Sequence, residues 1–256
     1  MTRRANDTYA PTPRHEIAVV VGRTGSGKTE LIRRVLAPAH PRRITIDVTG
    51  ECEELYPNAH VAVGFPDALR ALETWASRGL ERWHLVAVLD AQESAALAAT
   101  LVPIYRPGKK ALSADLGGVC LECSELDVYL PVSGANATVT AAWTTVLARG
   151  RHASCSIIAA TQRPAQVARI VTSQASRVIA FATHEPLDVQ WLARVGGARY
   201  ARAVRELGPF QSAWYHAGSG RVEVRNPDYT IAHQFRAHDG KDFSQTEIPG
   251  LAGSDI

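Results

Sequence analysis

The sequence has few of the features that mark a secreted or membrane-spanning protein. Four cysteines in 256 residues are too few for a disulfide framework, and they are typical of reduced, buried thiols. The longest unbroken apolar runs, such as Ile17–Val21, have five residues, whereas a membrane helix needs roughly 18–20. Residues 1–15 lack the apolar core of a signal peptide. We therefore expect an intracellular protein that is not itself transmembrane.

The charge balance is also weak. The chain has 28 Lys and Arg against 25 Asp and Glu, so its formal net charge is only +3. This excess is too small to predict nucleic-acid binding by itself, and any basic surface must come from local arrangement. A chain of this length can bury roughly 70–75% of its unfolded surface, which is enough for one large domain with appendages.

Cys120 and Cys123 form a C-x-x-C pair, a spacing found in zinc sites. No second pair of Cys or His follows at the spacing that a zinc site needs, and the two cysteines lie in a run typical of a strand. The sequence therefore predicts two buried thiols here and no metal centre.

Short runs rich in Val and Ile alternate with longer segments of helical spacing, the pattern of a parallel sheet built from βαβ units. We predict strands at residues 16–21, 43–48, 84–89, 119–121, 156–160 and 177–182. The predicted helices are residues 28–36, 66–77, 91–104, 137–148 and 164–174, followed by one or two helices at 186–207 broken near Gly196 and Gly197.

The two ends of the chain differ from this pattern. Residues 1–14 are polar and contain two prolines, so we expect a flexible N-terminal arm. Residues 210–216 and 221–224 flank a glycine-bearing loop and predict a β-hairpin. Periodicity is lost from Asn226 onward, which predicts a tail that is disordered or docks on a neighbour. The expected division is an arm at 1–14, a domain at 15–225 and a tail at 226–256.

The strongest local signal is a complete G-x-x-x-x-G-K-[ST] match that directly follows an apolar strand and directly precedes a helix. It comprises Gly22, Arg23, Thr24, Gly25, Ser26, Gly27, Lys28 and Thr29. Glycines let backbone N–H groups turn inward around a phosphate, Lys28 can reach the β and γ phosphates, and the Thr29 hydroxyl suits Mg²⁺. The motif predicts a binding site for ATP and Mg²⁺. No N-K-x-D string, which GTPases use to bind guanine, is present.

A second chemical position lies where the predicted strand at 119–121 ends. An acidic residue here, Glu122, can hold a magnesium-bound water, and a second carboxylate nearby can orient the attacking water. The usual motor pattern is Asp-Glu, whereas this chain has Glu122 followed by Cys123, so the second carboxylate is missing from its expected place. Three interpretations stay open: Glu125 is the general base, Glu122 serves both roles, or the protein is a weak or inactive ATPase.

The strand at 156–160 ends in the sequence Thr161-Gln162-Arg163-Pro164. In open α/β sheets, ligands bind beyond the carboxyl ends of the strands, so the Gln162 amide is well placed to contact a γ-phosphate and its water. A polar residue of this kind, on a strand between the phosphate-loop strand and the acidic strand, is typical of motor ATPases.

These motifs, and especially the segment RGRHASCSIIAATQRPAQV at residues 149–167, resemble the FtsK–HerA superfamily of P-loop motor ATPases. The small size and the second strand ending in IDVTGE at residues 46–51 resemble the genome-packaging ATPases of tailless, membrane-containing icosahedral viruses. The resemblance covers roughly residues 15–195. It implies a RecA-like core, a homo-oligomeric ring that is a hexamer, and ATP-driven movement of double-stranded DNA through that ring.

The resemblance also implies a location in the host cytoplasm or at the virion vertex, with a capsid-vertex or membrane protein as partner. In such rings an arginine from the neighbouring subunit stabilises charge on the γ-phosphate. Arg151, in the matching Gly-Arg-His block, is the first candidate, with Arg149 and Arg177 as alternatives. Two basic groups suit sequence-independent phosphate contacts, although each also fits a solvated face. They are Lys109 with Lys110, and the series Arg199, Arg202 and Arg205.

Three other functions remain open at this point. A conjugation or filamentous-phage assembly ATPase would share the motifs and would favour a membrane anchor. A nucleotide kinase would transfer phosphate to an acceptor without DNA stimulation. A nucleotide-binding assembly scaffold would bind ATP and oligomerise without turnover.

Overall fold

The computed structural model describes residues 15–48, 50, 52–103, 111–132 and 136–237. The described residues form one mixed sheet of ten strands in the order β10-β9-β8-β7-β1-β6-β5-β2-β4-β3. The strands are β1 (Ile17–Val21), β2 (Arg42–Asp47), β3 (His60–Val63), β4 (Trp83–Val88), β5 (Val119–Cys123), β6 (Cys155–Thr161), β7 (Arg177–Phe181), β8 (Ser212–His216), β9 (Arg221–Arg225) and β10 (Ile231–Arg236).

The seven strands from β3 to β7 in this order run parallel, and β8, β9 and β10 extend the sheet in antiparallel fashion. Every residue of the central strands β1, β5 and β6 is buried, because helices cover both faces of a parallel sheet. This is why the apolar runs of these strands were recognisable in the sequence. The predicted α/β class with a mainly parallel sheet is confirmed.

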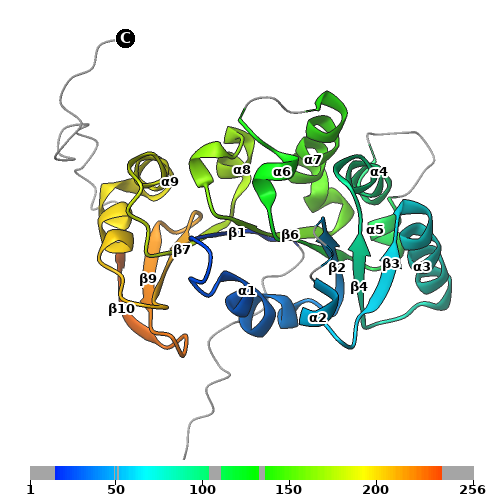
Figure 1. The fold of residues 1–256 in the computed structure, drawn as a ribbon, viewed down its shortest axis with the longest axis horizontal. Coiled ribbons are helices and arrows are strands. Elements are labelled where there is room, and N and C mark those ends of the chain that lie inside the picture. Colours follow the sequence, from blue (N-terminus) through cyan, green and yellow to red (C-terminus); the bar gives the residue numbers. More distant parts are fainter. Residues whose placement is uncertain (1–14, 49, 51, 104–110, 133–135, 238–256) are drawn as a thin grey trace, which may run out of the picture.

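Two layers of helices enclose the sheet (Figure 1). One face packs against α3 (Phe65–Arg78), α4 (Ala91–Leu101), α7 (Ala137–Arg149), α8 (Arg169–Gln174) and α9 (Pro186–Arg205), and the other face packs against α1 (Lys28–Leu31), which continues as the π-helical turn η1 (Ile32–Leu36). Short helical segments connect these elements: η2 (Ala37–Ala39), α2 (Cys52–Leu55), α5 (Leu112–Asp115), α6 (Leu126–Tyr129), η3 (Gly150–Ala153) and η4 (Pro164–Gln166).

Cys120 and Cys123 lie on opposite faces of β5, because successive side chains of a strand alternate between its faces and the two positions are three apart. Both thiols are free and buried, as are Cys52 and Cys155. The prediction of buried thiols is confirmed.

Two helix predictions need comment. The predicted helix at 164–174 is interrupted, because Val167 is extended (φ −91°, ψ 136°) and Ala168 donates its N–H to the carbonyl of Leu130. The segment at 186–207 is a single element, α9, with a break at Gly197, whose φ of 82° and ψ of 165° are not helical. The predicted break near Gly196 and Gly197 is confirmed.

The C-terminal hairpin is confirmed as β8 and β9, but it does not end the sheet. The sequence predicts no regular structure after Asn226, whereas residues 231–236 form β10 and pair with β9. The side chains of this edge strand are almost all exposed, so β10 lacks the alternation of apolar and polar residues that identifies a strand. The sequence did not predict β3 for the same reason, because only Ala62 is buried in this strand. The expected arm at 1–14 and residues 238–256 lie outside the described residues.

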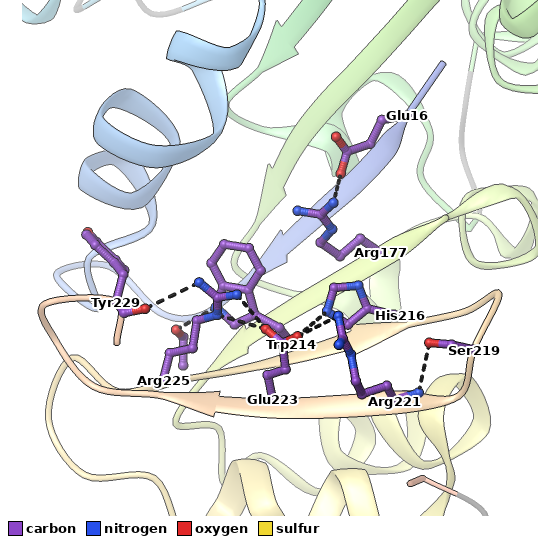
Figure 2. A network of polar contacts seen from close by, with 10 residues as sticks. Glu16, Arg177, Trp214, His216, Ser219, Arg221, Glu223, Arg225 and Tyr229 are labelled. Atoms are coloured by element: carbon purple, nitrogen blue, oxygen red, sulfur yellow. Dashed lines mark hydrogen bonds and ion pairs between the residues drawn. The ribbon is translucent and has the colours of Figure 1, made fainter. Parts of the chain in front are cut away.

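A network of charged side chains around the buried Glu223 supports this antiparallel extension (Figure 2). Glu223 on β9 is 2% exposed and receives ion pairs from Arg221 at 2.7 Å and from Arg225. His216 and Arg225 hold the pKa of Glu223 at about 2, with the contact to His216 as the largest cause, although burial of the carboxyl acts in the opposite direction. The Arg225 guanidinium also lies 4.2 Å from the centre of the buried Trp214 ring. The network joins β8 to β9.

No helix in the described part of the chain combines the length and the apolarity that crossing a bilayer would require.

Candidate nucleotide-binding site

The phosphate-loop motif forms a turn between the carboxyl end of β1 and the start of α1. Gly27 has a φ of 102°, a left-handed conformation that favours glycine, and it immediately precedes Lys28. A Cβ atom on Gly22 would lie 2.6 Å from the Ser26 hydroxyl, so this position also requires the absence of a side chain. The strand, loop and helix have the arrangement that the motif needs.

Two observations test whether this loop fits a triphosphate. Ser26 Oγ is buried and has no hydrogen-bond partner among the described residues, so a polar group is missing from its surroundings. Lys28 Nζ donates to the carbonyls of Gly22 at 2.6 Å and Arg23 at 3.0 Å, which are weaker partners than a phosphate oxygen. The residues of the loop therefore fit the phosphates of a nucleotide.

A cavity of about 520 Å³ lies against the loop. It brings together all the residues predicted for phosphate and metal chemistry except Gly22, Arg23, Ser26 and Arg151, and its lining includes Thr24, Gly25, Gly27, Lys28, Thr29, Glu122, Glu125 and Gln162. Burial lowers the pKa of Lys28, and the charge of the Glu125 carboxylate opposes this effect. Glu125 is thus the acid whose charge acts on Lys28.

Gln162 follows β6, and β6 lies between β1 and β5 in the sheet. Its Oε1 accepts a hydrogen bond of 2.8 Å from the Thr24 hydroxyl, which ties the end of β6 to the loop. Thr161 fixes this strand end by donating to Asp127 Oδ1 at 3.0 Å and accepting from the N–H of Arg163 at 3.1 Å.

Glu122 is buried at 6% exposure, and both of its carboxylate oxygens accept hydrogen bonds. The Tyr56 hydroxyl donates to Oε1 through a short contact, and the Thr45 hydroxyl lies 3.1 Å from Oε2. Burial raises the pKa of Glu122, and the bonds from Tyr56 and Thr45 together with the charge of Arg43 act in the opposite direction. The carboxylate is thus held in place by neutral donors.

The partners of Glu122 belong to a wider polar cluster. Thr45 lies opposite Glu122 in the pairing of β2 with β5, and its hydroxyl is 2.8 Å from His84 Nε2. Burial lowers the pKa of His84 to about 4, so this imidazole is neutral at pH 7. Asp47 accepts the N–H groups of Gly50 and Cys52 at 2.9 and 2.8 Å, which shapes the connection to α2 and to Tyr56.

The sequence did not identify Tyr56, Thr45 or Asp47 as site residues on their own. Thr45 carried a usable signal, because it is a polar residue inside a buried strand beside the acidic strand. Tyr56 follows α2, a four-residue helix without periodicity, so nothing in the sequence linked it to Glu122.

The arginine candidates lie away from this cavity. Arg151 belongs to η3, which lies at the amino end of β6, whereas the loop lies at the carboxyl end of the neighbouring parallel strand β1. A seven-residue strand separates these two ends by about 20 Å. Arg151 is exposed, and its Nε lies 3.2 Å from His152 Nε2. Arg149 precedes the same turn. Arg177 is only 11% exposed and forms an ion pair of 3.0 Å with the buried Glu16.

Of the two basic groups predicted to contact DNA phosphates, the structure describes only the arginine series. Arg199, Arg202 and Arg205 are exposed on α9. Arg199 also lies 4.6 Å from the centre of the Phe235 ring on β10. Lys109 and Lys110 lie outside the described residues. Among the described residues no group of three or more His, Cys, Asp or Glu side chains could hold a metal ion.

The fold and the phosphate loop together define the chain as a P-loop NTPase in architecture, with a RecA-like core. Neither a protein-family model nor a curated protein sequence matches the chain. Among solved structures it is similar to the genome packaging NTPase B204 from Sulfolobus turreted icosahedral virus 2 in complex with ATPγS. The two are 24% identical, with 84% of this chain and 99% of that chain covered and a TM-score of 0.65.

Two further structures share the fold. The DNA-packaging ATPase B204 from Sulfolobus turreted icosahedral virus is 23% identical, with 83% of this chain and 97% of that chain covered and a TM-score of 0.63. The cytoplasmic domain of the type VII secretion ATPase EccC from Thermomonospora curvata is 12% identical, with 82% and 23% covered and a TM-score of 0.50. At these identities the likeness is one of fold, and it agrees with the resemblance to the FtsK–HerA superfamily.

Proposed function

We propose that the protein is an ATP-hydrolysing motor that translocates double-stranded DNA and packages a viral genome into a preformed capsid. The observation that carries this proposal is the convergence of the phosphate loop, Gln162 and two acidic residues on one cavity at the ends of β1, β6 and β5. The fold similarity to a genome packaging NTPase in complex with ATPγS supports the same function. The related secretion ATPase supports a motor more generally.

Within this proposal, the loop and Lys28 bind the phosphates of ATP, and Gln162 contacts the γ-phosphate. Mg²⁺, when bound, neutralises phosphate charge as it develops during hydrolysis. Thr29 and Glu122 are the residues that would hold it. Glu122 keeps a fixed orientation because Tyr56 and Thr45 both donate to it.

We propose Glu125 as the general base. It is half-buried at the cavity, it is the carboxylate whose charge acts on Lys28, and its side chain makes no hydrogen bond to the residues that the structure describes. Glu125→Gln is expected to abolish hydrolysis while ATP binding survives, and turnover measured beside an ATP-binding assay checks both. Unchanged turnover would remove Glu125 from the site and leave Glu122 with both roles.

The motor is proposed to work as a hexameric ring in which Arg151 acts on the neighbouring subunit's nucleotide. A mixing experiment tests this directly. Arg151→Ala and Lys28→Ala are each expected to be inactive, but an equimolar mixture regains part of the turnover, because an intact loop then lies beside an intact Arg151. No recovery would mean that Arg151 acts within its own subunit or not at all.

Steady-state ATP hydrolysis with and without double-stranded DNA tests the function itself. We expect DNA-stimulated turnover that Lys28→Ala abolishes and that Arg70→Ala, a change on the exposed side of α3, leaves unaltered. ATP binding without turnover in either condition would favour an assembly scaffold, or a motor that is active only on an assembled capsid. The proposed setting is the host cytoplasm or the virion vertex, with a capsid-vertex or membrane protein as partner.

A further inference from the structure

Phe210 lies in the turn between α9 and β8 and has two unusual properties. Its side chain is 57% exposed, and its φ is +57°, a left-handed conformation that a bulky aromatic residue rarely adopts. A single exposed aromatic residue needs no explanation by itself. Strained backbone, however, persists only where the surrounding structure enforces it.

The structure does enforce this turn. Gln211 Oε1 accepts the N–H of Gly208 at 2.9 Å, and Gln211 Nε2 donates to Asn226 Oδ1 at 3.2 Å. The β8 strand that follows is joined to β9 through the Glu223 network (Figure 2). Phe210 is therefore presented from a braced position.

The ring lies beside the phosphate loop. A Cβ atom built on Gly27 would be 3.5 Å from Phe210 Cδ1 and 3.5 Å from the buried Phe181 ring, so the two aromatic residues flank the last glycine of the loop. Phe181 is 2% exposed and belongs to the core under α1. Phe210 is therefore the member of this pair that a ligand can reach from solvent.

The sheet order decides which end of a nucleotide lies near Phe210. Glu122, Glu125 and Gln162 follow β5 and β6, on one side of β1. Phe210 precedes β8, on the other side of β1 beyond β7, and Figure 1 places β7 and β9 on the opposite side of β1 from β6 and β2. The γ-phosphate must face the acidic side, so the nucleoside end of the molecule points toward β7 and β8.

We infer that Phe210 is the stacking surface for the nucleobase of the bound nucleoside triphosphate. This rests on the proposed function and deepens it by assigning the base subsite. A phenyl ring stacks on any base, because every base has a π-face. Phe210 therefore contributes affinity for purine nucleotides without distinguishing adenine from guanine.

Calorimetric titration of the full chain tests the assignment with three probes: ATPγS, GTPγS and inorganic tripolyphosphate, which has no base. Phe210→Ala is expected to weaken both nucleotides by roughly tenfold or more, the range of base–aromatic stacking, and to leave tripolyphosphate unchanged. Phe210→Tyr retains the ring and the affinity. Leu187→Ala removes an apolar side chain that is 60% exposed at the start of α9 and serves as the matched control without effect.

Two results would overturn the assignment. Equal affinities of wild type and Phe210→Ala for ATPγS would show that the ring does not contact the base. An equal loss for tripolyphosphate would show that the substitution acts through the loop instead. Melting curves establish that each variant is folded. Failure of the wild type to bind either ATPγS or tripolyphosphate would contradict the proposed function itself, which is a different result from the two above.

Discussion

Two buried glutamates lie at opposite parts of the sheet and have opposite surroundings. Glu122, on β5 in the parallel half, receives hydrogen bonds from the neutral hydroxyls of Tyr56 and Thr45, and burial raises its pKa. Glu223, on β9 in the antiparallel half, is surrounded by Arg221, Arg225 and His216, and its pKa falls to about 2.

The difference separates a structural carboxylate from the one that the proposed function assigns to Mg²⁺. The charge of Glu223 is paired with the buried Arg225 and the half-exposed Arg221, so its contribution is to hold the antiparallel strands in place (Figure 2). Glu122 has fixed geometry and forms no ion pair with any residue that the structure describes, and it lies in the cavity beside Lys28. A buried carboxylate without an ion-pair partner suits a bound cation, because the cation supplies the positive charge that balances it. Perturbed acids of this kind are typical of functional sites.

The largest expected effect is the loss of stability in Glu223→Gln, which removes the charge and keeps the size of the side chain. Removing one partner of a buried ion pair leaves the cations uncompensated and costs about 3–5 kcal/mol. For a protein of this size that corresponds to a fall in melting temperature of roughly 10 °C. Glu122→Gln is the matched change in the other half of the sheet, and its melting temperature is expected to move by only a few degrees. A reversal of the two shifts would refute the contrast.

Acid titration sharpens the same comparison. The pKa of Glu223 is about 2 in the folded state and about 4.5 without perturbation, so its contribution to stability is present above pH 4.5 and is lost as pH falls toward 2. Glu122 has the opposite sign, because its raised pKa favours folding at low pH and the benefit is lost as pH rises through the folded value.

Urea unfolding at pH steps from 7 to 3 measures both effects. Wild type is expected to lose stability steadily below pH 4.5, and Glu223→Gln to lose less over the same range. The difference in unfolding free energy between Glu122→Gln and wild type is expected to favour the variant more at pH 7 than at pH 4. Glu206→Gln, on an exposed residue that follows α9, provides the control with little change. Parallel curves for wild type and Glu223→Gln would exclude the compensated pair as the source of acid sensitivity.

The interior strands of the sheet and the β8–β9 hairpin were largely predictable from the sequence, and the two edge strands were not. Strands such as β1 and β6 are buried on both faces, so their composition is apolar throughout. β10 and β3 lie at the two edges, where few side chains are buried and no pattern is required of the sequence. The sequence therefore did not predict these two edge strands, and only the structure shows them.

The residues of the candidate site also differ in how far the sequence predicted them. The phosphate loop and Gln162 are readable because their chemistry depends on residues adjacent in the chain. Glu122 was identified, but its partner Tyr56 is 66 residues away and follows a helix of four residues. Phe210 was assigned to a strand that begins only at Ser212, so its exposure and its place beside Gly27 could not be inferred. Contacts of long sequence separation with no shared motif leave no local signal.

A smaller and more specific test removes the Tyr56 hydroxyl, which donates a hydrogen bond to Glu122. The bond from Tyr56 lowers the pKa of Glu122, so Tyr56→Phe is expected to raise this pKa further while costing about 1–3 kcal/mol of stability. If Glu122 must be ionised for turnover, the acidic limb of the pH profile of kcat/KM moves to higher pH in this variant. The decisive readout is activity at pH 6, which falls more than activity at pH 8.

Tyr129→Phe separates this effect from the general cost of losing a buried hydroxyl. The Tyr129 hydroxyl is buried and has no hydrogen-bond partner in the described part of the chain, so its removal is expected to leave the profile in place and the stability equal or higher. A uniform fall in kcat/KM at every pH in Tyr56→Phe would mean that the phenol only positions Glu122. An unshifted profile at full activity would mean that the ionisation of Glu122 does not limit the reaction, and the contrast with Glu223 would then be one of stability alone.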